Sequence, residues 1–141
     1  MNREEIINNV KNIILQKVQV EAIVLFGSYA RGDERQDSDI DIAIKPKKFM
    51  DKNEMIELQN AIEDEIDLDV HLINLYTIEE DFKYDILITG KLLYVEDNLK
   101  FWNYMFKTFS DYLELNEDRK TIIDALREGG TLYGKWISHI K

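Results

Sequence analysis

Two periods of hydrophobic residues run along the chain, and each predicts one type of element. Apolar residues spaced three and four apart are typical of amphipathic helices. This spacing occurs in four stretches, which are residues 3–17, 53–65, 78–88 and 98–128. The last helix is rich in aromatic residues, and we expect Phe101, Met105, Phe109 and Tyr112 to pack inward, with Trp102, Phe106 and Leu113 beside them.

Strands are indicated where apolar residues are contiguous or alternate with polar ones. They are expected at residues 20–26, 39–44, 67–73 and 92–95, the last as an edge strand. A short turn or a helical turn is expected directly after the first strand. Helices and strands mixed at this spacing predict an α+β (α/β) domain, with a small mixed β-sheet flanked by helices.

Two of the strands carry aspartates, which is unusual because Asp is depleted from strands. Side chains two residues apart share a face, so Asp39 and Asp41 point to one face of the strand and the alternating Ile40, Ile42 and Ile44 to the other, which is the core face. Asp67, Asp69 and His71 repeat the pattern on the next strand. If the strands are neighbours, three or four carboxylates converge, which suits Mg²⁺. The alternative is that these aspartates only mark a solvent-exposed face.

A Gly-Ser pair directly follows the first strand. Gly27 lets the backbone approach a ligand closely, and the Ser28 hydroxyl and the following N–H groups can face an anion. Arg31 is a fork-shaped donor for phosphate. An ordinary tight turn is the alternative, and Asp33-Glu34 exclude a Walker A loop, which needs Lys and Ser/Thr there. Together with the paired aspartates, the turn predicts nucleotidyl transfer, in which metal ions offset the triphosphate charge.

Composition and charge limit the kinds of site and partner that the protein can have. The chain of 141 residues suggests one domain. The absence of cysteine excludes disulfides. With only two histidines, which are far apart in the sequence, a zinc site is not expected. A formal net charge of −10 argues against direct nucleic-acid binding, but not against one nucleotide carried with its metal ions. The sequence has neither a signal-peptide pattern nor a stretch approaching a membrane span, so a cytoplasmic protein without membrane contact is expected.

The stretch GSYARGDERQDSDIDIAI, residues 27–44, is similar to the signature of the DNA polymerase β-like nucleotidyltransferase superfamily, which is Gly-Ser, ten residues and Asp-x-Asp. It resembles most the minimal nucleotidyltransferase (MNT) group, the MntA-like antitoxins of HEPN/MNT toxin–antitoxin pairs. The stretches IDLDVHLINL and ILITGKLLYVED extend the resemblance to roughly residues 20–97.

The resemblance implies roles for particular residues. The nucleotide-binding residues would be Gly27, Ser28 and Arg31, and the ligands of two Mg²⁺ ions would be Asp39, Asp41 and Asp69. Asp69 would also be the candidate base for the acceptor hydroxyl, and Asp67 is its rival for that role. Residues 1–97 would form the catalytic core, and residues 98–141 a helical extension that belongs to the same domain or docks a partner.

The resemblance also implies a reaction, the transfer of AMP from ATP to a tyrosine of a cognate HEPN RNase toxin, which neutralises the toxin. Because only a short segment follows the core, the acceptor is expected to come from the partner protein. Two alternatives stay open, a small-molecule nucleotidyltransferase of the aminoglycoside-modifying type and a non-catalytic antitoxin that acts by occlusion.

Overall fold

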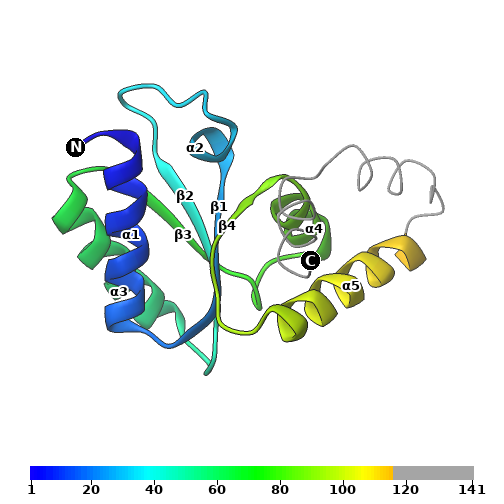
Figure 1. The fold of residues 1–141 in the computed structure, drawn as a ribbon. Coiled ribbons are helices and arrows are strands. Elements are labelled where there is room, and N and C mark those ends of the chain that lie inside the picture. Colours follow the sequence, from blue (N-terminus) through cyan, green and yellow to red (C-terminus); the bar gives the residue numbers. More distant parts are fainter. Residues whose placement is uncertain (116–141) are drawn as a thin grey trace.

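The computed structural model describes residues 1–115, and the predictions for Asn116 and beyond lie outside this range. In chain order the elements are α1 (Arg3–Lys17), β1 (Val20–Phe26), α2 (Gly27–Arg31), β2 (Ile40–Pro46), α3 (Lys52–Ile66), β3 (Val70–Asn74), α4 (Glu80–Thr89), β4 (Lys91–Val95) and α5 (Asn98–Leu115). The expected strands and helices are present as far as residue 115, and the segment directly after β1 is the short helix α2 (Figure 1). None of the described helices combines the length and apolar character needed to cross a bilayer.

The four strands form one mixed sheet in the order β3-β2-β1-β4. β1 is antiparallel to both β2 and β4, whereas β2 is parallel to β3. The predicted mixed sheet is therefore confirmed, and β4 lies at an edge as expected. This order places the end of β1, the start of β2 and the start of β3 next to one another.

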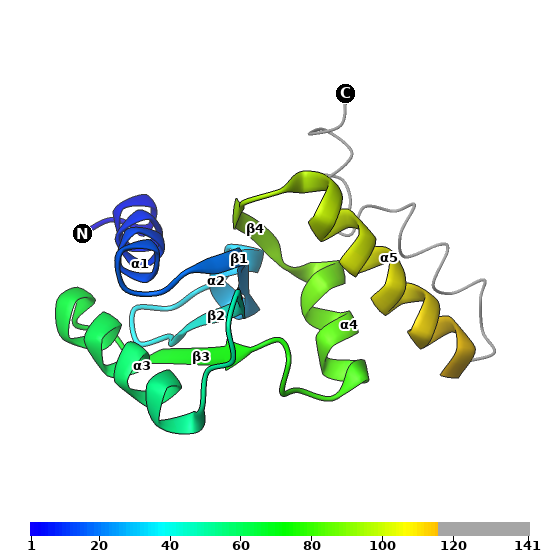
Figure 2. The same cartoon turned by 90° about the horizontal axis from the view of Figure 1, so that it is seen from below.

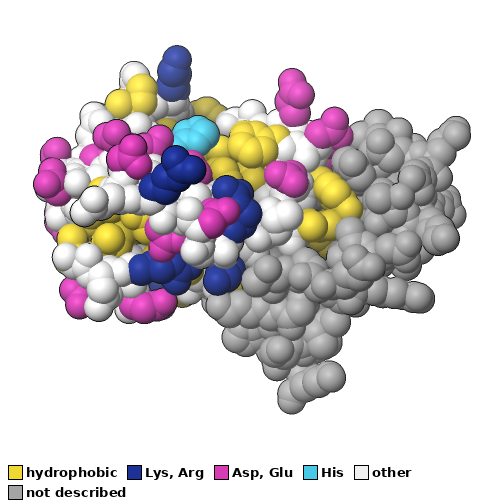
Figure 3. All heavy atoms as spheres, turned by 90° about the horizontal axis from the view of Figure 1, so that it is seen from above, with side chains coloured by type: hydrophobic (Ala, Val, Ile, Leu, Met, Phe, Trp, Pro, Cys, Tyr) yellow, Lys and Arg dark blue, Asp and Glu magenta, His cyan; other side chains and the backbone are white. Residues whose placement is uncertain are grey.

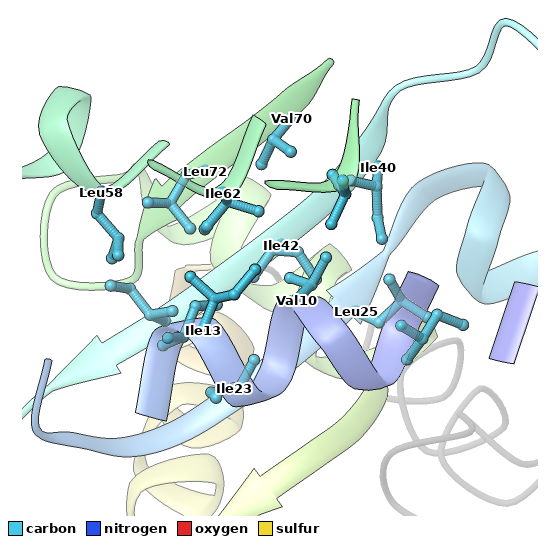
Figure 4. Packing of buried hydrophobic residues seen from close by; sticks show 14 of the residues in the cluster. Val10, Ile13, Ile23, Leu25, Ile40, Ile42, Leu58, Ile62, Val70 and Leu72 are labelled. Carbon is cyan, nitrogen blue, oxygen red and sulfur yellow. The ribbon is translucent and has the colours of Figure 1, made fainter. Parts of the chain in front are cut away.

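Helices cover both faces of the sheet. Figures 1 and 2 show α1 and α3 on one face and α4 and α5 on the other. The isoleucines of β2 pack against α1 and α3, where side chains such as Val10, Ile42 and Ile62 meet (Figure 4). This confirms the predicted core face.

Asp39 and Asp41 were expected on an exposed face, and this holds for Asp39, whereas Asp41 is only partly exposed because the rest of that face is covered. Ala43, which shares the face of Asp41, is fully buried in a second core cluster beneath α4 and α5. Phe101, Met105 and Phe109 of α5 join this cluster, as predicted, while Phe106 is exposed. The side chains of Tyr112 and Leu113 lie outside the described part of the chain. Asp41 therefore stands at the end of a buried face.

Helix ends fix where the strands begin. The Asn2 side chain accepts a hydrogen bond from the Glu5 N–H at 2.9 Å and caps α1. Asp51 and Glu54 form a capping box at the start of α3. At the other end of α3, Asp67 caps the helix in the left-handed conformation, with φ 55° and ψ 41°. The Asp67 cap thus ends α3 shortly before β3 begins at Val70.

Candidate active site

The Gly-Ser turn and the first two aspartates meet at the end of the β1–β2 pair. Because the strands are antiparallel, Phe26 at the end of β1 is paired with Asp41 near the start of β2. Gly27 follows with φ +70°, and a Cβ on it would lie 2.1 Å from Asp41 Oδ2. The Asp41 carboxylate therefore packs directly on the Gly27 backbone, and only glycine leaves room for it.

Asp41 also contacts the neighbouring strand. Parallel pairing sets His71 of β3 beside Asp41, and His71 Nδ1 lies 3.3 Å from Asp41 Oδ1. Burial raises the pKa of Asp41, the His71 imidazole opposes this shift, and the charge of Asp39 adds to it. His71 was expected only to share the carboxylate face, and here it holds one of the carboxylates.

The third strand begins later than predicted, which separates the two rival aspartates. The expected strand at 67–73 starts at Val70, because Asp67 still belongs to the end of α3 and donates its N–H to the Glu63 carbonyl at 2.9 Å. Asp67 is therefore not on the strand face predicted for it. Asp69 lies directly before β3, where its carbonyl accepts a hydrogen bond from the Ile40 N–H at 3.0 Å and its side chain is exposed.

The site offers two adjacent carboxylates and no larger cluster. Among residues 1–115, no three Asp, Glu or His side chains lie close enough together to hold a metal ion. The structure thus pairs Asp39 with Asp41 but does not add Asp69 to them in one cluster. Mg²⁺ usually takes one or two protein carboxylates and completes its shell with substrate phosphates and water. The Asp39–Asp41 pair fits Mg²⁺ that arrives with a nucleotide.

Helix α2 carries the other two predicted nucleotide-binding residues. The Ser28 carbonyl accepts hydrogen bonds from the N–H groups of Gly32 at 2.9 Å and Asp33 at 3.1 Å, which closes the helix. Arg31 is exposed, and its Nε lies 3.2 Å from Asp33 Oδ2. Its charge is near enough to lower the pKa of Asp41, against the larger effect of burial. Arg31 therefore stands at the edge of the carboxylate pair.

Arg3 holds the loop that leads to Asp39, and the sequence pattern did not identify it. Arg3 Nε lies 2.9 Å from Glu34 Oε1, and the guanidinium also donates to the Tyr29 carbonyl. These contacts tie α1 to the segment between α2 and β2. No local signal identifies this pair, because its members are far apart in the sequence.

A row of aromatic rings borders the carboxylates and was also missed. The Phe26 ring lies 6.3 Å from the His71 ring and 6.0 Å from the Phe82 ring, with the two phenylalanines edge to face. Figure 3 looks onto this end of the sheet and shows the imidazole beside hydrophobic side chains, with charged groups around them. The available signal was a phenylalanine in the strongly charged stretch EEDFKYD, residues 79–85.

Comparisons with known proteins agree with this geometry. A family model described as polymerase beta, nucleotidyltransferase matches residues 8–99. The protein adenylyltransferase MntA of Shewanella oneidensis is 32% identical over 109 residues, covering 75% of this chain and 76% of that protein. The protein adenylyltransferase MntA of Thermococcus cleftensis is 33% identical over 70 residues, covering 50% of this chain and 71% of that protein.

Solved structures are similar over most of the described fold. A toxin–antitoxin crystal structure with AMP-PNP has a TM-score of 0.71 and 28% identity, covering 86% of this chain and 98% of that chain. A structure of the tri-AMPylated Shewanella oneidensis HEPN toxin in complex with its MNT antitoxin has a TM-score of 0.69 and 26% identity, covering 89% of this chain and 99% of that chain.

Proposed function

We propose that this chain, which belongs to the polymerase β nucleotidyltransferase family, is an antitoxin that transfers AMP from ATP to a tyrosine of a cognate HEPN toxin. One observation carries the proposal. Gly27 and Ser28 directly follow β1 and lie beside Asp39 and Asp41, and the Asp41 carboxylate occupies the space that a side chain at Gly27 would need. A phosphate-binding turn and a pair of metal-binding carboxylates therefore share one small site.

The proposed residue roles follow from this arrangement. The backbone at Gly27 and the Ser28 hydroxyl would bind the β- and γ-phosphates of ATP, with Arg31 as a further cationic contact at the rim. Asp39 and Asp41 would hold two Mg²⁺ ions, and Asp69, which forms no cluster with them among the described residues, would join them once the ions are bound. When bound, these ions would offset the triphosphate charge and favour ionisation of the acceptor hydroxyl.

The acceptor must be presented in line with the leaving group. A tyrosine oxygen would attack the α-phosphorus, the bond from that phosphorus to the pyrophosphate oxygen would break, and AMP would stay on the tyrosine. Asp69 is the proposed acceptor of the phenol proton. The main contribution of the protein to such a reaction is to position the reacting groups. The partner toxin would complete the site by supplying the tyrosine oxygen.

Residues 98–141 are proposed to serve both the fold and the partner. The core residues of α5 support assignment of its described part to the same domain as residues 1–97. Trp102 and Phe106 lie outside that core stripe, with ring centroids 6.3 Å apart, and would face the toxin. A cytoplasmic location is part of the proposal, since the expected acceptor is an RNase that acts on cellular RNA.

Release of pyrophosphate tests the reaction whichever tyrosine is modified. With ATP and Mg²⁺ alone, the protein should release little pyrophosphate, and addition of the cognate HEPN toxin should start the release. The variant Asp39→Asn/Asp41→Asn should remain folded and release none. Equal release by the variant and the wild type would contradict the proposed site, and release with an aminoglycoside in place of the toxin would indicate a small-molecule transferase.

A further inference from the structure

We propose that the Phe82 ring, supported by Phe26 behind it, is the surface on which the adenine base of the bound nucleotide stacks. The inference rests on the proposed function and adds to it the residue that recognises the base. It starts from the aromatic row His71–Phe26–Phe82, which is formed by three separate elements, β3, β1 and α4.

Phe82 is not placed as a core residue. The buried residues of α4 are Ile86, Leu87 and Ile88 near its end, whereas Phe82 lies in its first turn and is 39% exposed. Its neighbours Asp81 and Glu79 are charged and exposed. One side of the ring contacts Phe26 edge to face, and the exposed part of its surface is open to a ligand.

The row begins at the reaction centre. Phe26 is paired with Asp41 across the two strands and is followed directly by Gly27. Phe26 itself is only 8% exposed, so it supports a neighbouring ring and offers little surface of its own. In a nucleotide whose α-phosphate lies at Asp41, the ribose and base would extend from the carboxylates past Phe26, and the base would reach Phe82.

The position of the row favours the base over the ring of the acceptor tyrosine. In-line attack needs the acceptor oxygen opposite the pyrophosphate, and therefore on the side away from Gly27 and Ser28. Phe82 contacts Phe26, the residue before Gly27, so Phe82 lies on the side of the site where Gly27 and Ser28 would bind the phosphates. Charged groups such as Arg31 and Asp33 surround the rest of the turn and offer no flat apolar surface for a base.

Binding measurements without catalysis test this assignment. The probes are α,β-methylene-ATP, whose bridge blocks adenylyl transfer, and inorganic tripolyphosphate, which lacks the base, each with Mg²⁺ in a calorimeter. Stacking of a base on an aromatic ring is worth about 1–3 kcal/mol, so Phe82→Ala should raise the Kd of the methylene analogue about 5- to 150-fold. The Kd of tripolyphosphate should not change.

Two further variants separate stacking from folding. Phe82→Tyr should bind the analogue as the wild type does, and Phe82→Leu, which keeps an apolar contact with Phe26, should still lose affinity. Phe49→Ala is the matched control, because Phe49 is 83% exposed and lies beyond the opposite end of β2. It should bind both probes as the wild type does.

The outcomes of these measurements test the role of Phe82 separately from the proposed function. An unchanged Kd of the analogue in Phe82→Ala, or an equal loss of tripolyphosphate affinity, would overturn the base assignment and leave the proposed function standing. A raised KM for the toxin with unchanged analogue binding would overturn it too, because the ring would then belong to the acceptor. A wild-type protein that binds neither probe would contradict the proposed function itself.

Discussion

Gly27 is the backbone position against which the carboxylate of Asp41, a proposed metal ligand, is packed. It combines a positive φ of +70° with the absence of room for a side chain, since Asp41 Oδ2 occupies that room. Gly32, at the other end of α2, has a similar φ of +80° but nothing within 4 Å of where its Cβ would be. A substitution at Gly32 therefore tests backbone strain alone, whereas one at Gly27 tests strain together with displacement of the Asp41 carboxylate.

The variants Gly27→Ala and Gly32→Ala should behave differently. Both place alanine in the left-handed region, which costs about 1–2 kcal/mol, so both should lower the free energy of unfolding in urea. Only Gly27→Ala pushes Asp41 out of place, and only it should lose most of its AMP transfer, on the order of 10²-fold. Full activity of Gly27→Ala, or an equal loss in Gly32→Ala, would contradict this account of the turn.

Asp41, a proposed metal ligand, is partly buried, and this burial disfavours its charged form. Its folded-state pKa is raised above the usual 3.8, first by burial and then by Asp39. A raised carboxyl pKa favours the folded protein at low pH, and this contribution is lost as the pH rises through the folded pKa. Asp41→Asn should therefore be at least as stable as the wild type at pH 7 by thermal unfolding, while transfer falls at least about 100-fold.

A clear drop in Tm for Asp41→Asn would mean that the contact with His71 stabilises the fold. His71→Asn is the matched variant, because it removes the same 3.3 Å contact and leaves the carboxylate in place. If only His71→Asn lowers Tm, the imidazole has packing contacts of its own, such as the one with Phe26.

At the level of helices and strands, local patterns predicted the elements but not the contacts between them. The motif around Gly27 and Asp39 was readable because its residues lie close together in the sequence. The start of β3 was misplaced because Asp67 fits both an alternating strand and a left-handed helix cap, and the helix α3 determined the outcome. The contacts of Arg3 and Phe82 depend on strand order and helix placement, which no short pattern contains.

Arg3 of α1 is expected to stabilise the loop before β2 through its ion pair with Glu34. Removal of its guanidinium leaves Glu34, whose side chain is 16% exposed, without its ion-pair partner at 2.9 Å. Arg3→Ala should cost about 1–3 kcal/mol of unfolding free energy and lower kcat, because the loop leading to Asp39 is no longer fixed. Arg35→Ala, in the same loop but exposed, should change neither. Equal effects of the two variants would show that the loop does not depend on α1.

In the whole molecule, a second charged cluster stabilises the end of the sheet away from the active site. Lys45 is buried, forms an ion pair with Glu21, and lies 5.3 Å from the centroid of the Tyr76 ring and 4.8 Å from that of Tyr104. Lys100 of α5 also reaches Glu21, at 2.5 Å. The cluster thus joins β1 and β2 to α5 and connects the extension with the core.

This cluster makes stability depend on pH in a defined direction. Burial raises the pKa of Glu21, but hydrogen bonds from Lys100 and Lys45 outweigh it and hold the pKa below the usual 4.5. A lowered pKa stabilises the fold above pH 4.5 and loses this contribution as the pH falls through the folded value. Glu21→Gln should be about 1–3 kcal/mol less stable than the wild type at pH 7.

Urea unfolding of both proteins at neutral and at strongly acidic pH measures this contribution. The difference between wild type and Glu21→Gln should shrink once Glu21 is protonated in the folded wild type. A difference that stays constant across the acid range would mean that Glu21 acts through packing and not through its charge.

The mass of the toxin after separation from this protein tests the central claim most directly. The cognate HEPN toxin is incubated with the protein, ATP and Mg²⁺, separated under denaturing conditions, refolded and weighed by mass spectrometry, and its RNase activity is then assayed. We predict a toxin heavier by one or more AMP groups that stays inactive, and an unmodified, active toxin when Asp39→Asn/Asp41→Asn is used. An unmodified toxin that regains full activity after contact with the wild-type protein would contradict the account, because neutralisation would then occur by occlusion.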